Sequence, residues 1–318
     1  MTMEKHIMKT SLVFIAALSL VMVVAAEARA DGVAIAPEAI PAEQRDALAQ
    51  LIAQAKASHP ETFAAVAAVD TYTTQGMKKV RSGKPEAARA FMRLGRPALL
   101  PMIELVAFDA RRGDLTEEQW TALGRGLLHA ISFLRDPRSA PVLEAVFKSS
   151  QHEEFMLKAG EGLGMLCGSR QQKLLLSGSK DSGPQRLAAI AGLGYCRTKA
   201  SAERLAAIMA ESNDAETAKI TAKSLGYVGS SWGLQADKSI PADRAETIRR
   251  IASEALVDHY ARYGKKVRKE MGHAVLMVEH PASVGRIESA RRRASGAIAT
   301  ELDDLRGRLE TSLARSSR

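Results

Sequence analysis

Aromatic side chains and strand-forming segments are scarce in this sequence of 318 residues. Aromatic residues make up 4% of the chain, while alanine, leucine and methionine occupy most apolar positions. Small and unbranched side chains favour helices and let them approach closely, whereas strands are rich in β-branched and aromatic residues. These absences exclude a sheet-based fold, and the sequence predicts an all-α protein.

Apolar runs long enough to cross a membrane are absent after the N-terminal segment. That segment has a basic start at Lys5 and Lys9, an apolar run over 12–26, and a small-x-small cleavage site at Ala28-Arg29-Ala30. The run is shorter than the roughly 20 residues that a spanning helix needs, so it predicts a signal peptide over 1–30. We expect an exported protein, periplasmic or secreted and not transmembrane after cleavage. An uncleaved N-terminal anchor is the alternative.

Recognisable catalytic and metal-binding motifs are also missing. Gly160, Gly162 and Gly164 are spaced as in some phosphate loops, but no strand precedes them and no Lys-Ser/Thr pair follows. These glycines are better explained as positions where neighbouring helices approach. His152 is followed four positions later by Met156, where a metalloprotease helix has a second histidine. We therefore expect no cofactor and no metal, and predict that the protein is not an enzyme.

A repeated pattern occupies the middle of the chain. A small residue, three others and then a leucine recur, with glycine after most of these leucines, at Leu94, Leu134, Leu163, Leu193 and Leu225. The last four leucines are spaced by roughly thirty residues, a period typical of stacked helical units. The sequence thus predicts a repeat architecture.

Two stretches carry a resemblance to a known family. Residues 130–147 (AISFLRDPRSAPVLEAVF) and 90–106 (AFMRLGRPALLPMIELV) each read as a helix, a tight turn and a proline-bearing second helix. They resemble HEAT and HEAT-like (PBS-lyase-type) repeats, and the resemblance covers roughly residues 85–240. It implies an α-solenoid of stacked helical hairpins whose extended surface binds other macromolecules. Later turns, such as Thr198-Lys199, depart from the Asp-Pro pattern and leave the repeat count open.

The chain is expected to divide into four regions. These are the signal peptide 1–30, an N-terminal helical cap 31–84, the HEAT-like repeat array 85–240 and a basic helical C-terminal region 241–318. Thr116 and Gln119 have the spacing of a capping box, which predicts a helix running to about Leu134. A single last helix is predicted from about Val284 to Leu313. Its leucine seam suits capping the stack or pairing with another chain.

The sequence holds only two cysteines, Cys167 and Cys196, which fall in consecutive repeats. An oxidising compartment permits a bridge between them. Equivalent positions in stacked helices lie about 10 Å apart, whereas a disulfide needs Cα atoms about 4.4–6.8 Å apart. Cys167 lies four residues after its repeat leucine, whereas Cys196 lies three residues after its own. A disulfide therefore requires this difference of one residue to bring the two Cα atoms closer together. Two buried free thiols are the alternative.

Positive charge is concentrated near the C-terminus. The formal net charge is +9, and it falls to +8 without residues 1–30. From Pro241 onward the sequence has 16 Lys and Arg residues and 11 Asp and Glu residues. The basic residues are densest in two runs, the first being Lys265, Lys266, Arg268 and Lys269, and the second Arg291, Arg292 and Arg293. Such runs form either a solvated helix face or a surface for an anionic partner, which could be an acidic protein, an envelope polymer or a lipid surface. Nucleic acid is not expected, because aromatic residues for base stacking are missing there.

These observations predict an exported, non-enzymatic protein-binding scaffold. A protein partner is expected on a concave face formed by the second helix of each repeat, where Arg138, Glu144 and Lys148 would point outward. One alternative is a cell-envelope enzyme, or an accessory subunit of one, with its site at the junction of the repeats and the C-terminal region. A buried His–carboxylate pair in a cleft would favour that alternative. Another is self-association through the C-terminal helix.

Overall fold

The computed structural model describes residues 31–69 and 86–316, and these contain helices and loops but no strand. The all-α prediction is confirmed. The helices are α1 (Ala42–Ser58), α2 (Pro60–Ala67), α4 (Glu86–Leu94), α5 (Leu99–Ala107), α6 (Glu117–Leu134), α7 (Ala140–Ser149), α8 (Glu153–Leu166), α9 (Ser169–Gly178), α10 (Gly183–Tyr195), α11 (Lys199–Glu211), α12 (Ala215–Val228), α13 (Ser231–Ala236), α14 (Ala242–Asp258), α15 (Lys265–Val278), α16 (Ser283–Arg293) and α17 (Gly296–Ser316).

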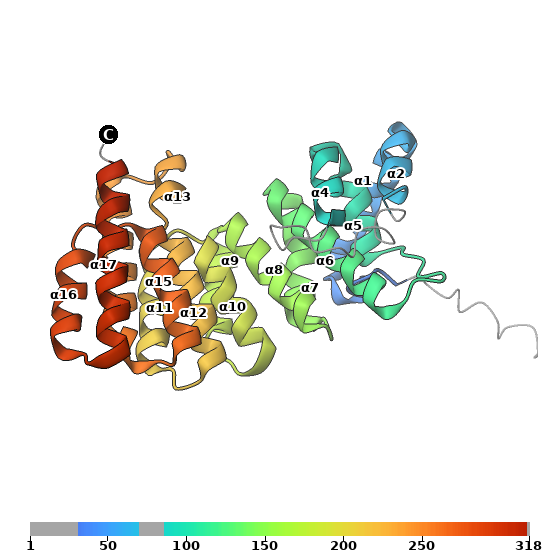
Figure 1. The fold of residues 1–318 in the computed structure, drawn as a ribbon. Coiled ribbons are helices and arrows are strands. Elements are labelled where there is room, and N and C mark those ends of the chain that lie inside the picture. The colour runs from blue at the N-terminus through green and yellow to red at the C-terminus, as the bar shows by residue number, and fades with distance from the viewer. Residues whose placement is uncertain (1–30, 70–85, 317–318) are drawn as a thin grey trace, which may run out of the picture.

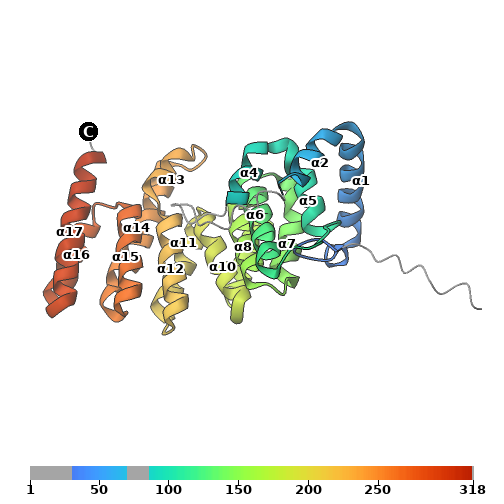
Figure 2. The ribbon, with the colours of Figure 1, turned by 45° about the vertical axis from the view of Figure 1, so that its right-hand side comes forward.

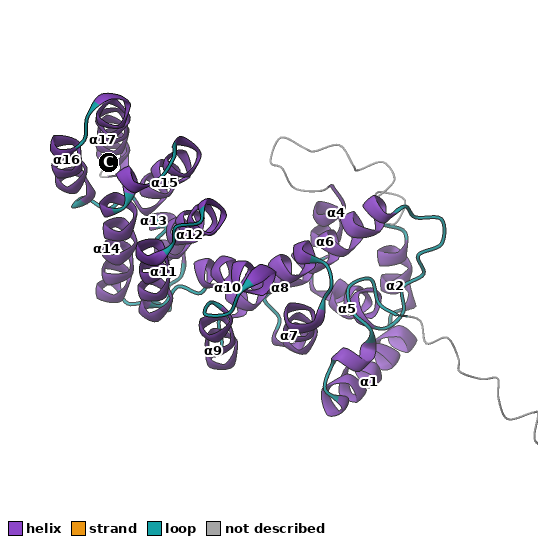
Figure 3. Ribbon diagram, turned by 90° about the horizontal axis from the view of Figure 1, so that it is seen from below, coloured by secondary structure: helices purple, strands orange, loops and turns teal. Residues whose placement is uncertain are grey.

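The helices form an elongated stack of two rows (Figures 1 and 2). We call α4, α6, α8, α10, α12 and α15 the inner row, and α5, α7, α9, α11, α14 and α16 the outer row. The repeat leucines Leu163, Leu193 and Leu225 are fully buried in the inner row. Seen along the helices, the stack bends near α10 and α12, and the inner row lines the inside of the bend (Figure 3).

Local capping explains where several helices begin. Thr116 and Gln119 form the predicted capping box at the start of α6: the Gln119 N–H donates to Thr116 Oγ1, and the Thr116 N–H donates to Gln119 Oε1. Asp214 caps α12 by accepting from the Thr217 N–H at 2.7 Å. Each cap satisfies backbone N–H groups that have no partner within the helix.

The C-terminal region differs from the prediction at its last helix. The single helix expected from Val284 to Leu313 is two helices, because the chain turns at Ala294-Ser295 and Gly296 has a φ of +54° that favours glycine. Just before this region, Ser231–Ala236 form the short helix α13. The leucine seam of α17 is buried against α15 and α16, with Leu302 and Leu309 fully buried. It therefore caps the stack within the chain.

The first described residues pack along the end of α5. The Val33 N–H donates to the Leu105 carbonyl at 2.8 Å and the Ala34 N–H donates to the Val106 carbonyl at 3.0 Å. Gly32 approaches so closely that a Cβ there would lie 2.2 Å from the Val106 oxygen. The predicted signal peptide lies outside the described residues. Among the described helices, none combines the length and apolarity that a membrane span needs.

Glycines bring α8 and α10 into backbone contact. A Cβ on Gly160 would lie 2.2 Å from the Ala188 carbonyl oxygen, and one on Gly164 would lie 1.9 Å from the Gly192 oxygen. Ordinary helix pairs are 8–10 Å apart because side chains separate them. Because glycine has no side chain, the backbones of α8 and α10 approach each other more closely than those of an ordinary helix pair. These glycines are packing positions, as the sequence suggested.

This approach places the two cysteines within bonding reach. Cys167 and Cys196 end α8 and α10, their Cα atoms are 5.1 Å apart, and they form a disulfide. The estimate of about 10 Å between equivalent positions overlooked the glycines that draw these two helices together. The neighbouring inner-row pairs are also close: Gly194 faces Ser224 of α12, and Gly226 faces Ala274 of α15.

Candidate interaction surface

The inside of the bend carries a small cleft between α8, α10 and α12. Its cavity is about 60 Å³. Its lining combines aromatic, aliphatic and charged side chains: Leu157, Glu161, Ala191, Tyr195, Ile220, Lys223, Ser224 and Tyr227. We call this set the inner groove. Because the inner row lines the concave side of the stack, the groove lies where an extended partner would contact several helices at once (Figure 3).

Two tyrosines line the inner groove. The rings of Tyr195 and Tyr227 stack with centroids 5.0 Å apart and planes inclined by 27°. Burial raises the pKa of the Tyr195 hydroxyl, and the negative charge of Glu161 raises it further. That hydroxyl therefore stays protonated at neutral pH and can donate a hydrogen bond.

Charged side chains surround the tyrosines. Lys223 lies over the Tyr227 ring, with Nζ 5.6 Å from its centroid. Glu161 is buried, and its Oε2 pairs with Lys158 Nζ at 2.7 Å. Lys223 is exposed and forms no ion pair with any described residue. It is thus a cation available to an incoming acid.

An exposed stripe on α15 extends the inner groove toward the basic region. Lys266, Lys269, His273 and Met277 are spaced by three, four and four residues, so they share one helical face, and all are exposed. A Cβ on Gly226 of α12 would lie 3.5 Å from the Met277 sulfur, which places this end of the stripe beside α12. The stripe joins part of the predicted basic patch to the concave side.

Other residues of the predicted basic patch are paired with acidic residues of α16 and α17. Arg268 makes two hydrogen bonds to Glu301, with Nε 2.7 Å from Oε2, and Arg291 Nε lies 3.0 Å from Asp303 Oδ2. Arg292 pairs with Glu288 at 3.2 Å. Both basic runs therefore flank the first half of α17. Four members form no hydrogen bond or ion pair with the described part of the chain: Lys265, Lys266, Lys269 and Arg293.

The structure reverses the expectation that the second helices line the concave face. These helices form the outer row. Glu144, expected to point outward, is buried on α7 and accepts hydrogen bonds from Arg170 at 2.7 Å and Gln171 at 3.0 Å. Arg138 is held by Asp136 at 2.7 Å, while Lys148 is exposed on the outer row.

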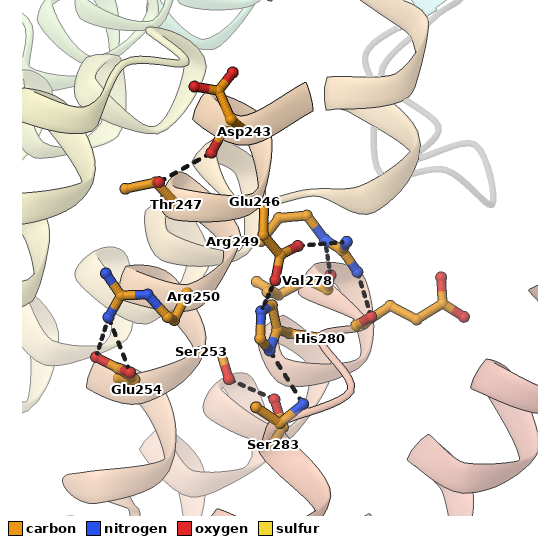
Figure 4. A network of polar contacts seen from close by, with 12 residues as sticks. Asp243, Glu246, Thr247, Arg249, Arg250, Ser253, Glu254, Val278, His280 and Ser283 are labelled. Atoms are coloured by element: carbon orange, nitrogen blue, oxygen red, sulfur yellow. Dashed lines mark hydrogen bonds and ion pairs between the residues drawn. The ribbon is translucent and has the colours of Figure 1, made fainter. Parts of the chain in front are cut away.

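A His–carboxylate pair lies between α14 and the turn from α15 to α16, but only its histidine is buried: the side chain of His280 is 5% exposed and that of Glu246 is 55% exposed (Figure 4). His280 Nε2 is 2.6 Å from Glu246 Oε1, and His280 Nδ1 accepts from the Ala282 N–H at 3.2 Å. Nδ1 is therefore the unprotonated nitrogen, and Nε2–H donates to Glu246. With both nitrogens engaged, the ring links two elements and presents no free nitrogen to a substrate in this structure.

Neighbouring hydrogen bonds also connect α14 to the end of α15 and the start of α16. Arg249 donates to the carbonyls of Val278 and Glu279 at the end of α15, and the hydroxyls of Ser253 and Ser283 hydrogen-bond to each other (Figure 4). A cation at a helix C-terminus is favourable because the last carbonyls carry partial negative charge. No group of three or more His, Cys, Asp or Glu side chains placed to bind a metal occurs in the two described ranges.

Comparison with known proteins gives only distant structural similarity. No known family model matches the sequence, and no curated protein matches it. Human deoxyhypusine hydroxylase in complex with glycerol is similar with a TM-score of 0.31 and 15% identity, covering 80% of this chain and 99% of that one. A computationally designed self-assembling cyclic homo-oligomer is similar with a TM-score of 0.20 and 12% identity, covering 85% of this chain and 97% of the design.

One of these comparisons corrects the prediction that the protein is not an enzyme. Human deoxyhypusine hydroxylase is an enzyme that shares the all-α, repeat-like arrangement of helices. A stack of helices therefore gives no reason to expect the absence of catalysis, and that prediction was wrong. At this level of similarity no reaction and no active-site residue are transferred to this chain.

Proposed function

We propose that this protein is an exported binding scaffold of HEAT-like repeats that holds an acidic polypeptide on its concave side. The binding surface comprises the inner groove and the exposed stripe of α15. The observation that carries the proposal is the stacked pair Tyr195–Tyr227 at the bend, with the unpaired Lys223 above it. Tyrosines contribute large contact area at low entropic cost, and unpaired lysines attract an acidic chain.

Export supports the choice of partner. The signal-peptide pattern over 1–30 predicts that the chain meets proteins of the envelope or the medium, where nucleic acid is not the usual anion. The concave stripe of α15 carries Lys266 and Lys269 without acidic partners among the described residues. An acidic segment lying along the inner row would meet these lysines and Lys223 in turn.

Site-specific photocrosslinking in cells tests the proposal. A photoreactive residue replaces Lys223 in the inner groove or, as the matched control, Lys148 on the outer row; both lysines are exposed. We expect one reproducible protein adduct at position 223 and none at 148. Equal labelling at both positions would contradict binding on the concave side, and so would no adduct at 223.

Charge reversal tests the acidic character of the partner. Lys266→Glu with Lys269→Glu should reduce the adduct at position 223 by at least tenfold. Lys173→Glu with Lys180→Glu, which changes the net charge equally near α9, should leave it unchanged, since both of these lysines are exposed away from the groove. If both pairs reduce the adduct equally, the attraction depends on overall charge and the proposed surface is wrong.

A further inference from the structure

Arg197 is a partly buried cation without a counter-ion among the described residues. It follows Cys196, whose disulfide to Cys167 fixes this stretch of backbone at the ends of α8 and α10. Its Nε is buried and has no hydrogen-bond partner in the described chain. Burying a charge without a partner costs free energy, so such a group is a candidate for binding an anion.

A glycine on α13 sets the position of this guanidinium. A Cβ on Gly233 would lie 2.5 Å from Arg197 Nη2 and 2.9 Å from Nε. The guanidinium therefore packs directly against the α13 backbone, and a methyl group at position 233 would displace it. Helix α13 projects beyond the ends of its neighbours (Figures 1 and 2).

The positive charge of a second arginine, Arg135, acts on the guanidinium of Arg197. Burial lowers the pKa of Arg197, and the positive charge of Arg135, at the left-handed end of α6, lowers it further. Asp237 is the acid near both arginines, but it lies outside ion-pair distance of either, and its Oδ1 accepts from the Ser239 hydroxyl at 2.6 Å. Positive charge at this edge is thus only partly balanced.

An exposed tryptophan is the chain neighbour of the glycine that packs against Arg197. Trp232 precedes Gly233 on α13 and is 78% exposed, the most exposed of the large apolar side chains in the described ranges. Tryptophan and arginine are the residues most enriched among those that dominate binding energy at protein interfaces. We call Arg135, Arg197, Trp232 and Gly233 the arginine notch.

We propose that the arginine notch binds a carboxylate of an acidic polypeptide, with Trp232 packing against the residue beside that carboxylate. A guanidinium donates two parallel hydrogen bonds to a carboxylate, and the two arginines would share its charge. A polypeptide fits better than a small anion, because the exposed tryptophan gives the flanking residue a surface to cover. This inference goes beyond the proposed function, since the notch is built from the ends of α6 and α10 together with α13 and shares no residue with the inner groove.

Tryptophan fluorescence provides the test. The sequence has two tryptophans, so Trp120→Phe leaves Trp232 as the sole reporter. The probe is an acetylated, amidated peptide of alternating glutamate and alanine. We expect a saturable change in Trp232 emission, and calorimetry on the unsubstituted protein should give the same affinity.

Three variants locate the binding. Arg197→Met should weaken peptide affinity at least tenfold. Gly233→Ala should weaken it similarly, because it displaces the guanidinium but keeps its charge. Arg292→Met, at an exposed arginine on α16, should leave the affinity unchanged. No saturable signal, or full affinity in Gly233→Ala, would overturn the proposal.

Two further measurements test the class of ligand and the role of Arg197. If acetate or inorganic phosphate competes at the same concentration at which the peptide saturates, the notch takes a free small anion and the polypeptide assignment is wrong. Thermal unfolding distinguishes a binding residue from a structural one. Arg197→Met should leave the Tm unchanged or raise it, because it removes an uncompensated charge. A lowered Tm would show that Arg197 is already compensated in the folded protein and would overturn the proposal.

Discussion

The middle and the C-terminal end of the stack are held together by different interactions. Between α8 and α10 the backbones touch through Gly160, Gly164 and Gly192, and a disulfide closes the end of the pair. Between α15, α16 and α17 the contacts include charged side chains, with Arg268 bound to Glu301 and Arg291 to Asp303. The first interface depends on the absence of side chains and on a covalent bond. The second depends in part on ionisation, so the two should respond to different perturbations.

Reducing the disulfide should have the largest effect. The bond joins residues 29 positions apart, and closing a loop of that size stabilises the folded state by about 3.6 kcal/mol. Urea unfolding followed by circular dichroism, with and without reductant, measures this difference. A loss below about 1 kcal/mol would show that the glycine contacts alone fix the interface.

Adding one methyl group at the glycine contact should be next in size. Gly164→Ala places a Cβ 1.9 Å from a backbone oxygen that cannot swing away, so we expect a loss of about 1–3 kcal/mol in the free energy of unfolding. The matched control is Gly307→Ala on α17, where a Cβ meets nothing within 4 Å. That change should stabilise the protein by about 0.5–1 kcal/mol, since alanine is the better helix former. Equal effects of the two substitutions would contradict the backbone contact.

At the C-terminal end the effect should depend on pH. The hydrogen bonds from Arg268 hold the pKa of Glu301 below its ordinary value of 4.5. A lowered pKa in the folded state means that the stabilisation is present above the unfolded pKa and is lost as the pH falls through the folded one. Glu301→Gln should therefore cost about 1 kcal/mol at pH 7 and progressively less below about pH 4.5. Chemical unfolding across pH 3–7 measures this; a cost that does not change with pH would contradict the ion pair.

The smallest effect is expected at an exposed pair on the same end. Glu288→Gln removes the partner of Arg292 on α16, where both side chains are about half exposed or more. Surface pairs four residues apart contribute about 0.3 kcal/mol, and salt screens them. We expect a change near the error of an unfolding measurement. A loss as large as that of Glu301→Gln would contradict the expectation that the more buried ion pair contributes more to stability.

The repeat frame and its caps could be predicted from the sequence because they depend on local spacing. Leu163, Leu193 and Leu225 are buried at the recurring position, and Thr116 with Gln119 forms the expected cap. The break in the last helix was also signalled locally, because Ser295-Gly296 precedes the leucine seam, yet the prediction extended the helix through these two residues. Gly296 takes a positive φ, and two helices result.

The candidate sites depend on contacts between distant residues, which spacing does not reveal. The Glu301 partner of Arg268 lies 33 positions away, and the Glu246 partner of His280 lies 34 positions away. Tyr195 and Tyr227 carry a weak signal, since each lies two residues after a repeat leucine in successive units. The row that lines the concave side was predicted wrongly, because the repeat pattern shows which residues are buried but not in which direction the stack bends.

The disulfide between α8 and α10 also has a mechanical consequence. If the chain is pulled from its two ends, the residues between Cys167 and Cys196 carry no tension, because the bond bypasses them. At roughly 3.5 Å per extended residue, this hides about 100 Å of contour length until the bond is reduced. The segment that contains α9 and α10 is therefore the least able to lengthen under load, while the helices on either side of it can still unfold one by one.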